Sequence, residues 1–268
     1  MREARRPPWG RGLAGRWALL VRLAVAVAII GAPGGGLGAG PAEIVRRAER
    51  DGRVVALTFD DGWSPERCGR ILDILLEHDV PATWFPNAVY VERAPALWRR
   101  IAEHHPIANH TTHHRDLTRL GAPEVRHVIA SDERRIEAVT GRPMSKLLRP
   151  PYGAYDERVR SIAADLGYDA LVLWDVAAAD AARGATDRKV TRFASRGGSG
   201  SIVVLHCGPQ VTPRVLPAII TRYACAGYRF ATVEGLMTGE PGVAAQAGCP
   251  RAVSSQSASP RPGRPRGA

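Results

Sequence analysis

The stretch VVALTFDDGW (residues 54–63) places two adjacent aspartates at the end of an apolar run. A short apolar run that ends in a polar turn is typical of a buried strand in a parallel sheet. Neighbouring carboxylates repel each other, and a buried carboxylate needs a cationic partner or a proton. Asp60 and Asp61 therefore predict a cation at the carboxyl end of this strand. The alternative is a solvated Asp-Asp-Gly turn.

Further short apolar runs alternate with helical patterns through the middle of the chain, as in a parallel α/β domain. Ser64-Pro65, Asp156 and Thr212-Pro213 predict helix starts, and Gly167 and Gly227 predict two helix ends. No repeat of fixed period is present, which excludes solenoids and propellers. Together with residues 54–59, seven strands are expected, the others at 82–85, 106–109, 146–149, 170–174, 201–205 and 229–233.

The two ends of the chain differ in composition from the middle. Residues 1–41 have an Arg-rich start, an apolar stretch and then small residues, which predicts an export signal. The apolar stretch is shorter than the ~20 residues of a spanning helix, so an uncleaved membrane anchor is the less favoured interpretation. Residues 239–268 are rich in Pro, Gly, Ser and Ala and predict a disordered tail. A single domain is expected over residues 42–238.

The net charge of +11 lies mainly in these ends. Residues 1–41 carry six Arg and one Glu, and residues 239–268 carry four Arg and one Glu, which leaves +3 for the middle. This distribution argues against a nucleic-acid partner. A membrane contact is expected only through the export signal, and the sequence does not indicate an oligomeric state.

Export would make the cysteines candidates for disulfides. The four are Cys68, Cys207, Cys225 and Cys249, and they allow three pairings. The sequence does not choose among these pairings, and free buried thiols are an equal alternative.

Polar motifs follow several of the predicted strands. They are NHTTHH (109–114), RPPYG (149–153), DVAAAD (175–180) and HCG (206–208). The carboxyl ends of parallel strands meet at one edge, where loops build a site.

Within NHTTHH, His110 and His114 are four residues apart and would share one face of a helix. Together with Asp61 they make a three-ligand metal site with open positions, which is the form of a catalytic zinc site. Fe²⁺, Co²⁺ and Ni²⁺ also accept this donor set. His113 is a competing partner for His110. A surface cluster of histidines is the alternative for this segment taken alone.

The ordered motifs TFDDG, HTTHH, RPPYG, WDVAAAD and VLH resemble those of the polysaccharide deacetylase family, carbohydrate esterase family four. The resemblance covers residues 54–238. It implies a distorted (β/α)7-type barrel and a metal-dependent hydrolase that removes acetyl groups from glycans such as chitin oligomers, peptidoglycan or xylan. It therefore also implies an acetylated polysaccharide or oligosaccharide as the substrate.

The resemblance also implies roles for single residues. Asp60 would be the general base, with Asp61, His110 and His114 as the metal ligands. Arg149 would pair with Asp60 and keep it ionised; an ordinary surface ion pair is the alternative.

Three more residues match the later motifs of the family. Tyr152 would offer its backbone N–H to the oxyanion, although a turn aromatic that only covers the rim is the alternative. His206 would be the general acid. Asp180 would hold His206 and raise its pKa, with Asp175 as the rival for this role.

The sequence departs from the family pattern at two positions. Ala181 stands where the family usually has Trp, which puts the fit of the acetyl group in doubt. Trp63 stands where Pro is common; it would either face a sugar ring or cover the end of the barrel. Three alternative functions follow: an acetylxylan esterase, a catalytically impaired carbohydrate-binding protein, and an oxygen-using iron enzyme with the same ligand set.

Overall fold

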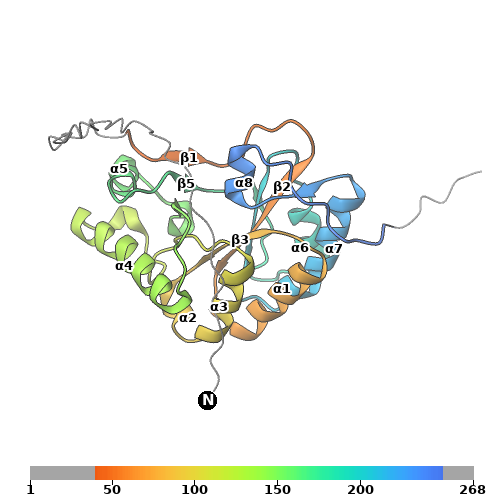
Figure 1. Cartoon of the computed structure of the whole chain (residues 1–268), viewed down its shortest axis with the longest axis horizontal. Helices are drawn as coiled ribbons and strands as arrows, with labels where there is room; N and C mark the ends of the chain where they lie inside the picture. The colour runs from red at the N-terminus through yellow and green to blue at the C-terminus, as the bar shows by residue number, and fades with distance from the viewer. Residues whose placement is uncertain (1–39, 250–268) are drawn as a thin grey trace, which may run out of the picture. The chain divides into compact units, whose positions relative to one another are not determined.

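The computed structural model describes residues 40–249, which form eight short strands surrounded by helices (Figure 1). The strands are β1 (Glu43–Val45), β2 (Val54–Asp61), β3 (Ala82–Pro86), β4 (Leu147–Leu148), β5 (Ala170–Val172), β6 (Val176–Ala177), β7 (Ile202–His206) and β8 (Arg229–Phe230). The α-helices are α1 (Pro65–Glu77), α2 (Ala88–Val91), α3 (Pro95–His104), α4 (Ala122–Thr140), α5 (Glu157–Asp165), α6 (Asp187–Ala194), α7 (Val211–Cys225) and α8 (Val233–Thr238). Two 3₁₀ turns are η1 (Leu117–Arg119) and η2 (Pro151–Gly153).

The strands form two parallel sheets that make up an incomplete barrel. One sheet has the order β3-β2-β7-β6, with β8 also paired to β2, and the other has the order β1-β5-β4. Isolated parallel bridges Trp84–Ile107 and Asn109–Leu148 connect β3 to β4 through residues 107–109. The α/β class and the distorted (β/α)7-type barrel are therefore confirmed.

The predicted strands differ from the observed ones in three places. The run at 106–109 makes only the isolated bridges described above. β1 and β6 were not predicted, because strands of three and two residues are too short to show an alternating pattern. The apolar run at 229–233 supplies only the two residues of β8, and α8 follows directly.

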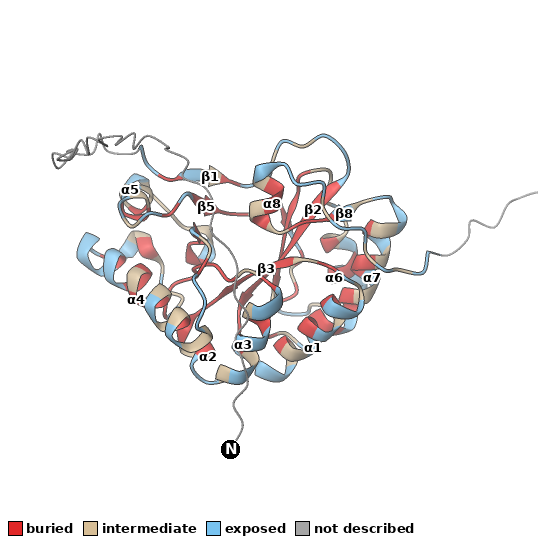
Figure 2. Ribbon diagram, in the orientation of Figure 1, coloured by how far each residue is buried: buried red, intermediate tan, exposed pale blue. Residues whose placement is uncertain are grey.

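β2 is the centre of the core, and all eight of its residues are buried. Burial on both faces explains why its sequence reads as a continuous apolar run rather than an alternating one. The buried residues gather on the strands and on the inward faces of the surrounding helices (Figure 2). Neighbouring helices also pack on one another, with α1 and α6 against α7 and with α4 against α3 and α5.

The predicted helix starts are confirmed, except that one helix begins a residue earlier than expected. α1 begins at Pro65, and α5 begins after Asp156, whose carboxylate accepts the N–H of Val159 at 2.8 Å. α7 begins at Val211, one residue before the expected cap Thr212. The Thr212 hydroxyl bonds to a carboxylate instead of capping the helix.

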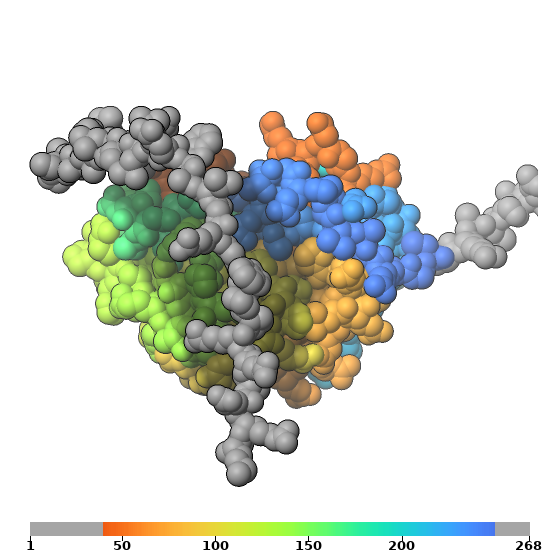
Figure 3. All heavy atoms as spheres, viewed as in Figure 1, coloured from red at the N-terminus to blue at the C-terminus, as the bar shows by residue number. Residues whose placement is uncertain are grey.

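The packed structure continues past residue 238, where we expected the tail to begin. Val243 pairs with Phe230 of β8, and the N–H of Gln246 donates to the carbonyl of His78 at the end of α1. This segment, blue in Figures 1 and 3, lies on the surface beside the orange α1. A disulfide joins Cys249 to Cys225 at the end of α7.

The rest of the expected tail, and nearly all of the expected export segment 1–41, lie outside the described residues. Within residues 40–249, no helix combines the length and the apolar character that a membrane span requires.

We predict that replacing both Cys225 and Cys249 with Ser lowers the free energy of unfolding by about 3 kcal/mol. The disulfide closes a loop of 24 residues, and the expected value follows from the chain entropy that such a loop removes from the unfolded state. Urea unfolding of the double variant and of the wild type, both without a reductant so that Cys68–Cys207 stays intact, measures the change. A double variant that unfolds at the same urea concentration as the oxidised wild type would contradict the prediction.

Candidate active site

Asp60 and Asp61 end β2 at the carboxyl edge of the larger sheet. In the strand register, Asp60 is opposite Phe85 of β3 and His206 of β7. Side chains alternate along a strand, and Asp61 has a φ of 72°, so the two carboxylates are directed differently. The structure therefore separates the two acidic groups, and each has its own partners.

Asp61, His110 and His114 converge on one point. Ligand atoms from the three side chains lie within 4.8 Å of one another. The Asp61 Oδ1 atom is 3.7 Å from Nε2 of His110 and 3.6 Å from Nε2 of His114. Two atoms that bind one Zn²⁺ at about 2.1 Å can be at most about 4.2 Å apart, so these separations fit a shared ion.

The charge states of these groups also fit a metal. Burial lowers the pKa of His110 to about 4, so its imidazole is neutral at pH 7. Its Nδ1 lies 2.7 Å from the carbonyl oxygen of Arg149, which therefore accepts the ring N–H and leaves Nε2 free to bind. Burial, followed by the charge of Asp60, raises the pKa of Asp61 to about 7. A divalent cation bound by Asp61 would offset the cost of burying its charged carboxylate.

The histidine segment is a bend and not the start of a helix. Thr111 and His114 have φ values of 64° and 54°, and this turn of the backbone brings His114 back toward His110. The two rings are 4.9 Å apart and almost perpendicular. His113, the competing partner, is exposed and lies outside the cluster.

Arg149 makes a fully buried ion pair with Asp60. One guanidinium nitrogen, NH1, lies 2.5 Å from Asp60 Oδ1 and 2.9 Å from the Thr58 hydroxyl. The other nitrogens donate to the carbonyls of Val172 and Leu173, and the guanidinium lies 4.0 Å from the centre of the Phe85 ring. Arg149 is thus part of the interior, not of a surface ion pair.

His206 and Asp180 form a second charged pair across the site. The Nδ1 atom of His206 is 2.8 Å from Asp180 Oδ1, and its backbone N–H donates to Oδ2 at 2.7 Å. The Thr212 hydroxyl donates to the same Oδ2 at 2.6 Å. Burial opposes the charged imidazolium, but Asp180, Asp60 and Asp61 outweigh it and raise the pKa of His206 to about 9.

Asp175, the rival for this position, has a different environment. It accepts hydrogen bonds from the Ser201 hydroxyl and the Ile202 N–H, at the opposite end of β7 from His206. Arg47 pairs with it from the solvent side. The structure brings Asp180, and not Asp175, to His206.

Two aromatic side chains flank the ligand set. Tyr152, in η2, is 69% exposed, and its ring lies 4.5 Å from the His114 ring. Its own φ is 61°, an unusual value that the Pro-Pro-Tyr-Gly turn imposes. Trp63 is 41% exposed, and its ring centre is 6.5 Å from that of His206. Ala181 is exposed beside Asp180.

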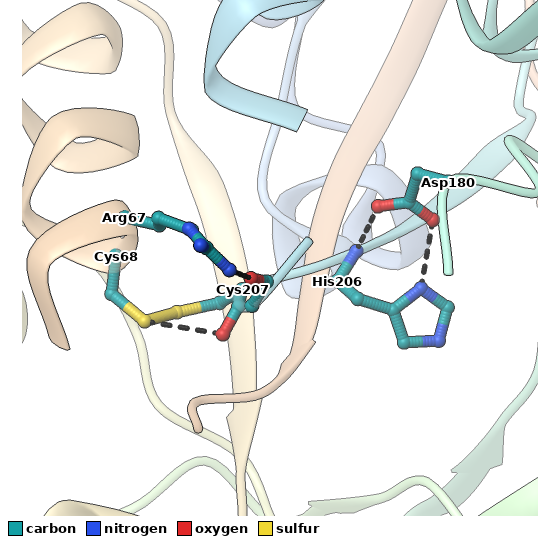
Figure 4. The surroundings of a disulfide bond; sticks show 6 residues. Arg67, Cys68, Asp180, His206 and Cys207 are labelled. Carbon is teal, nitrogen blue, oxygen red and sulfur yellow. Dashed lines mark hydrogen bonds and ion pairs between the residues drawn. A yellow bond between two sulfur atoms is a disulfide. The ribbon is translucent and has the colours of Figure 1, made fainter. Parts of the chain in front are cut away.

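A disulfide joins Cys207, next to His206, to Cys68 on α1 (Figure 4). Arg67 donates to the carbonyl of Gly208 at 2.6 Å, so α1 holds this loop through two adjacent residues. Trp63 covers Gly208 so closely that a Cβ there would lie 2.0 Å from the indole. Of the three possible pairings, the structure therefore has Cys68–Cys207 and Cys225–Cys249.

Three residues that contact the site were not predicted as site residues: Asn87, Thr58 and Thr212. Asn87 follows β3 at the same edge as the other site residues, and its side chain donates to the carbonyls of His110 and Thr111. A polar residue after a predicted strand is the signal that would have found it. Thr58 and Thr212 had no comparable signal, because their partners are far away in the sequence.

The comparisons with known proteins agree on one family. The model of that family, described as polysaccharide deacetylase, matches residues 47–171. A chitooligosaccharide deacetylase from Bradyrhizobium sp. (strain ANU 289) is 40% identical over 157 residues, which are 58% of this chain and 71% of that protein. A peptidoglycan N-acetylmuramic acid deacetylase from Bacillus subtilis (strain 168) is 31% identical over 191 residues, 69% of this chain and 72% of that protein.

Solved structures show the same likeness. A wild-type pseudoenzyme of carbohydrate esterase family 4 from Bacillus anthracis superposes with a TM-score of 0.69 at 28% identity. The match covers 74% of this chain and 70% of that one.

We predict that Arg149→Met destabilises the protein by about 3–5 kcal/mol, because it leaves the buried Asp60 carboxylate without its partner. Adding Asp60→Asn to this variant should restore part of the loss, since the uncompensated charge is then gone. Urea unfolding of both single variants and the double variant measures these changes. The prediction is wrong if the double variant is no more stable than Arg149→Met alone.

Proposed function

Because the chain belongs to the polysaccharide deacetylase family, we propose that it is a metal-dependent hydrolase that removes acetyl groups from glycan amines. One arrangement carries this proposal. The set Asp61, His110 and His114 occurs together with a carboxylate held by Arg149 and an imidazole held by Asp180, which face each other in the register of β2 and β7.

The donor set favours Zn²⁺ as the ion, and Co²⁺, Ni²⁺ and Fe²⁺ also suit two imidazoles and a carboxylate. Such an ion, when bound, polarises the acetyl carbonyl and acidifies water toward a pKa of about 7. All other steps of the proposed reaction belong to side chains and backbone groups of the chain itself.

Asp60 is the proposed general base. Its Oδ1 is occupied by Arg149, while Oδ2 faces the ligand set at 3.9 Å from His110 Nε2. The bond to Arg149 fixes the direction of this carboxylate. Oδ2 is therefore free to accept the proton of the attacking water.

His206 is the proposed general acid. Asp180 occupies Nδ1, so the other ring nitrogen, Nε2, is left to donate a proton to the departing sugar nitrogen. With a pKa of about 9, the imidazole carries that proton at neutral pH. The backbone N–H of Tyr152, beside His114, is the proposed donor to the oxyanion.

The names of the relatives indicate the substrate. A chitooligosaccharide deacetylase and a peptidoglycan N-acetylmuramic acid deacetylase both act on N-acetylated amino sugars. We propose the same class of substrate here, with the exposed Trp63 beside His206 and the exposed Tyr152 beside His114 as aromatic surfaces for it. An acetylxylan esterase is the alternative, since amide and ester acetyl groups would use the same proton-transfer groups.

Export is part of the proposal. A cell-envelope or extracellular substrate, the predicted export segment at residues 1–41 and the two disulfides all support it. The domain is proposed to begin near residue 42, and the predicted tail to follow the packed segment that ends at Cys249.

A carbohydrate-binding protein without turnover is the second candidate. Two observations favour it: Ala181 in place of the usual Trp, and the likeness to a pseudoenzyme of the same family. This candidate predicts binding of acetylated glycans without release of acetate.

The test is acetate release from a panel of chitin oligomers, peptidoglycan and acetylxylan, with and without a chelator. We expect release from the N-acetylated substrates and loss of release in the chelator. Asp60→Asn should lower kcat by about a hundred- to ten-thousand-fold, because the Asn side chain has the shape of Asp but cannot act as the general base. A full rate in Asp60→Asn rejects its role, and binding without acetate release by the wild type supports the second candidate.

The pH dependence tests His206. The acid must be protonated, so activity should fall as the pH rises through the pKa of His206, about 9. Asp180→Asn removes a charge that raises this pKa, so the alkaline limb of kcat should move to lower pH. Asp175→Asn is the matched control, since Asp175 does not contact His206, and it should leave the limb in place. An unmoved limb in Asp180→Asn would contradict the assignment.

A further inference from the structure

The backbone has unusual dihedral angles at two of the proposed metal ligands and at a residue between them. Asp61, Thr111 and His114 all have positive φ values, 72°, 64° and 54°. Such a conformation is strained for a residue other than glycine and persists only where the surroundings hold it. The protein must therefore contain groups that hold these backbones in place.

Asn87 contacts two of these three strained residues directly. Its backbone N–H donates to the carbonyl of Asp61 at 2.9 Å. Its side-chain Nδ2 donates to the carbonyls of His110 and Thr111 at 2.8 and 3.0 Å. One fully buried residue thus bonds to the backbone of two metal-facing side chains that are 49 positions apart in the sequence.

The chemistry of these contacts requires a carboxamide. Both side-chain contacts are donations to carbonyl oxygens, so the NH₂ group does the holding, and the Oδ1 atom has no partner among the described residues. An aspartate side chain has the same shape but only acceptor oxygens, so it would have no hydrogen to donate to the two carbonyl oxygens. The position after β3 places this group between the end of β2 and the histidine bend.

The neighbours of Asn87 fix it in turn. The N–H of Ala88, the next residue, donates to Asp132 of α4 at 2.9 Å. Asn109 supports the other side of the bend by accepting the N–H of Thr111 at 2.9 Å. The bend is therefore held by the side chains of Asn87 and Asn109, not by a regular element of its own.

We propose that Asn87 is a positioning residue that presets the spacing of Asp61 and His110, so that metal affinity depends on its carboxamide. The inference rests on the proposed function, because it assumes that the three-residue set binds a metal. Groups that orient metal ligands are typically worth about ten- to a hundredfold in affinity.

The experiment compares Zn²⁺ binding to metal-free wild type, Asn87→Ala and Asn87→Asp by competition with a chromogenic chelator. We expect both variants to bind Zn²⁺ about ten- to a hundredfold more weakly. Tyr223→Phe is the matched control. The buried Tyr223 hydroxyl also makes two hydrogen bonds to backbone groups, those of Ala194 and Gly197. These residues are far in sequence from the proposed metal ligands. Tyr223→Phe should lower the melting temperature and leave the Zn²⁺ affinity unchanged.

The possible outcomes separate the two proposals. If Asn87→Ala and Asn87→Asp bind Zn²⁺ as tightly as the wild type and only melt earlier, like Tyr223→Phe, Asn87 is structural and the inference is overturned. If the wild type itself binds no Zn²⁺, Co²⁺ or Ni²⁺, the metal site of the proposed function fails, and the inference fails with it. If circular dichroism shows that either variant is unfolded, the Zn²⁺ affinity of Asn87→Ser, which keeps a hydroxyl donor, is measured in its place. Weaker binding than in the wild type supports the inference, and equal binding overturns it.

Discussion

The buried pair of Arg149 and Asp60 is the interaction on which the site depends. Burying two charges is costly, and the cost is offset only when hydrogen bonds satisfy the remaining donors. Arg149 meets this condition: it donates to Asp60, to Thr58 of the same strand and to two carbonyls in the chain around β5. Its own carbonyl accepts from His110. One residue therefore links both sheets, the proposed base and a proposed metal ligand.

The two sides of the site use ion pairs of opposite arrangement. On one side the Arg149 guanidinium bonds to the Asp60 carboxylate, and on the other the Asp180 carboxylate bonds to the His206 imidazole and raises its pKa. The environments of the proposed base and the proposed acid therefore differ, as a site with both functions requires. The Cys68–Cys207 disulfide, the Trp63 ring over Gly208 and the hydrogen bonds to Asp180 all hold the short loop at His206.

Much of the fold and of the candidate site could be predicted from the sequence, because the residues that follow parallel strands lie at the same edge of the sheet. Asp61, His110 and His114 were found in this way, and the structure brings them together. What was not predicted depends on contacts between distant residues or on single dihedral angles. The pairing of the cysteines, the preference for Asp180 over Asp175 and the bend at Thr111 are of this kind. β1 and β6 were not predicted, because a strand of two or three residues is too short to show an alternating hydrophobic pattern.

The ends of the described chain have a consequence for how the molecule can be held. β1 begins beside the first residue of β5, and Arg47 bridges to Ser201 just before β7. At the other end, Val243 pairs with β8 beside the start of β2, and Cys249 is attached to the end of α7. Both points belong to the amino-terminal edge of the strands. A resin or a purification tag coupled at residue 40 or residue 249 would therefore leave the candidate site, at the carboxyl edge of the strands, uncovered.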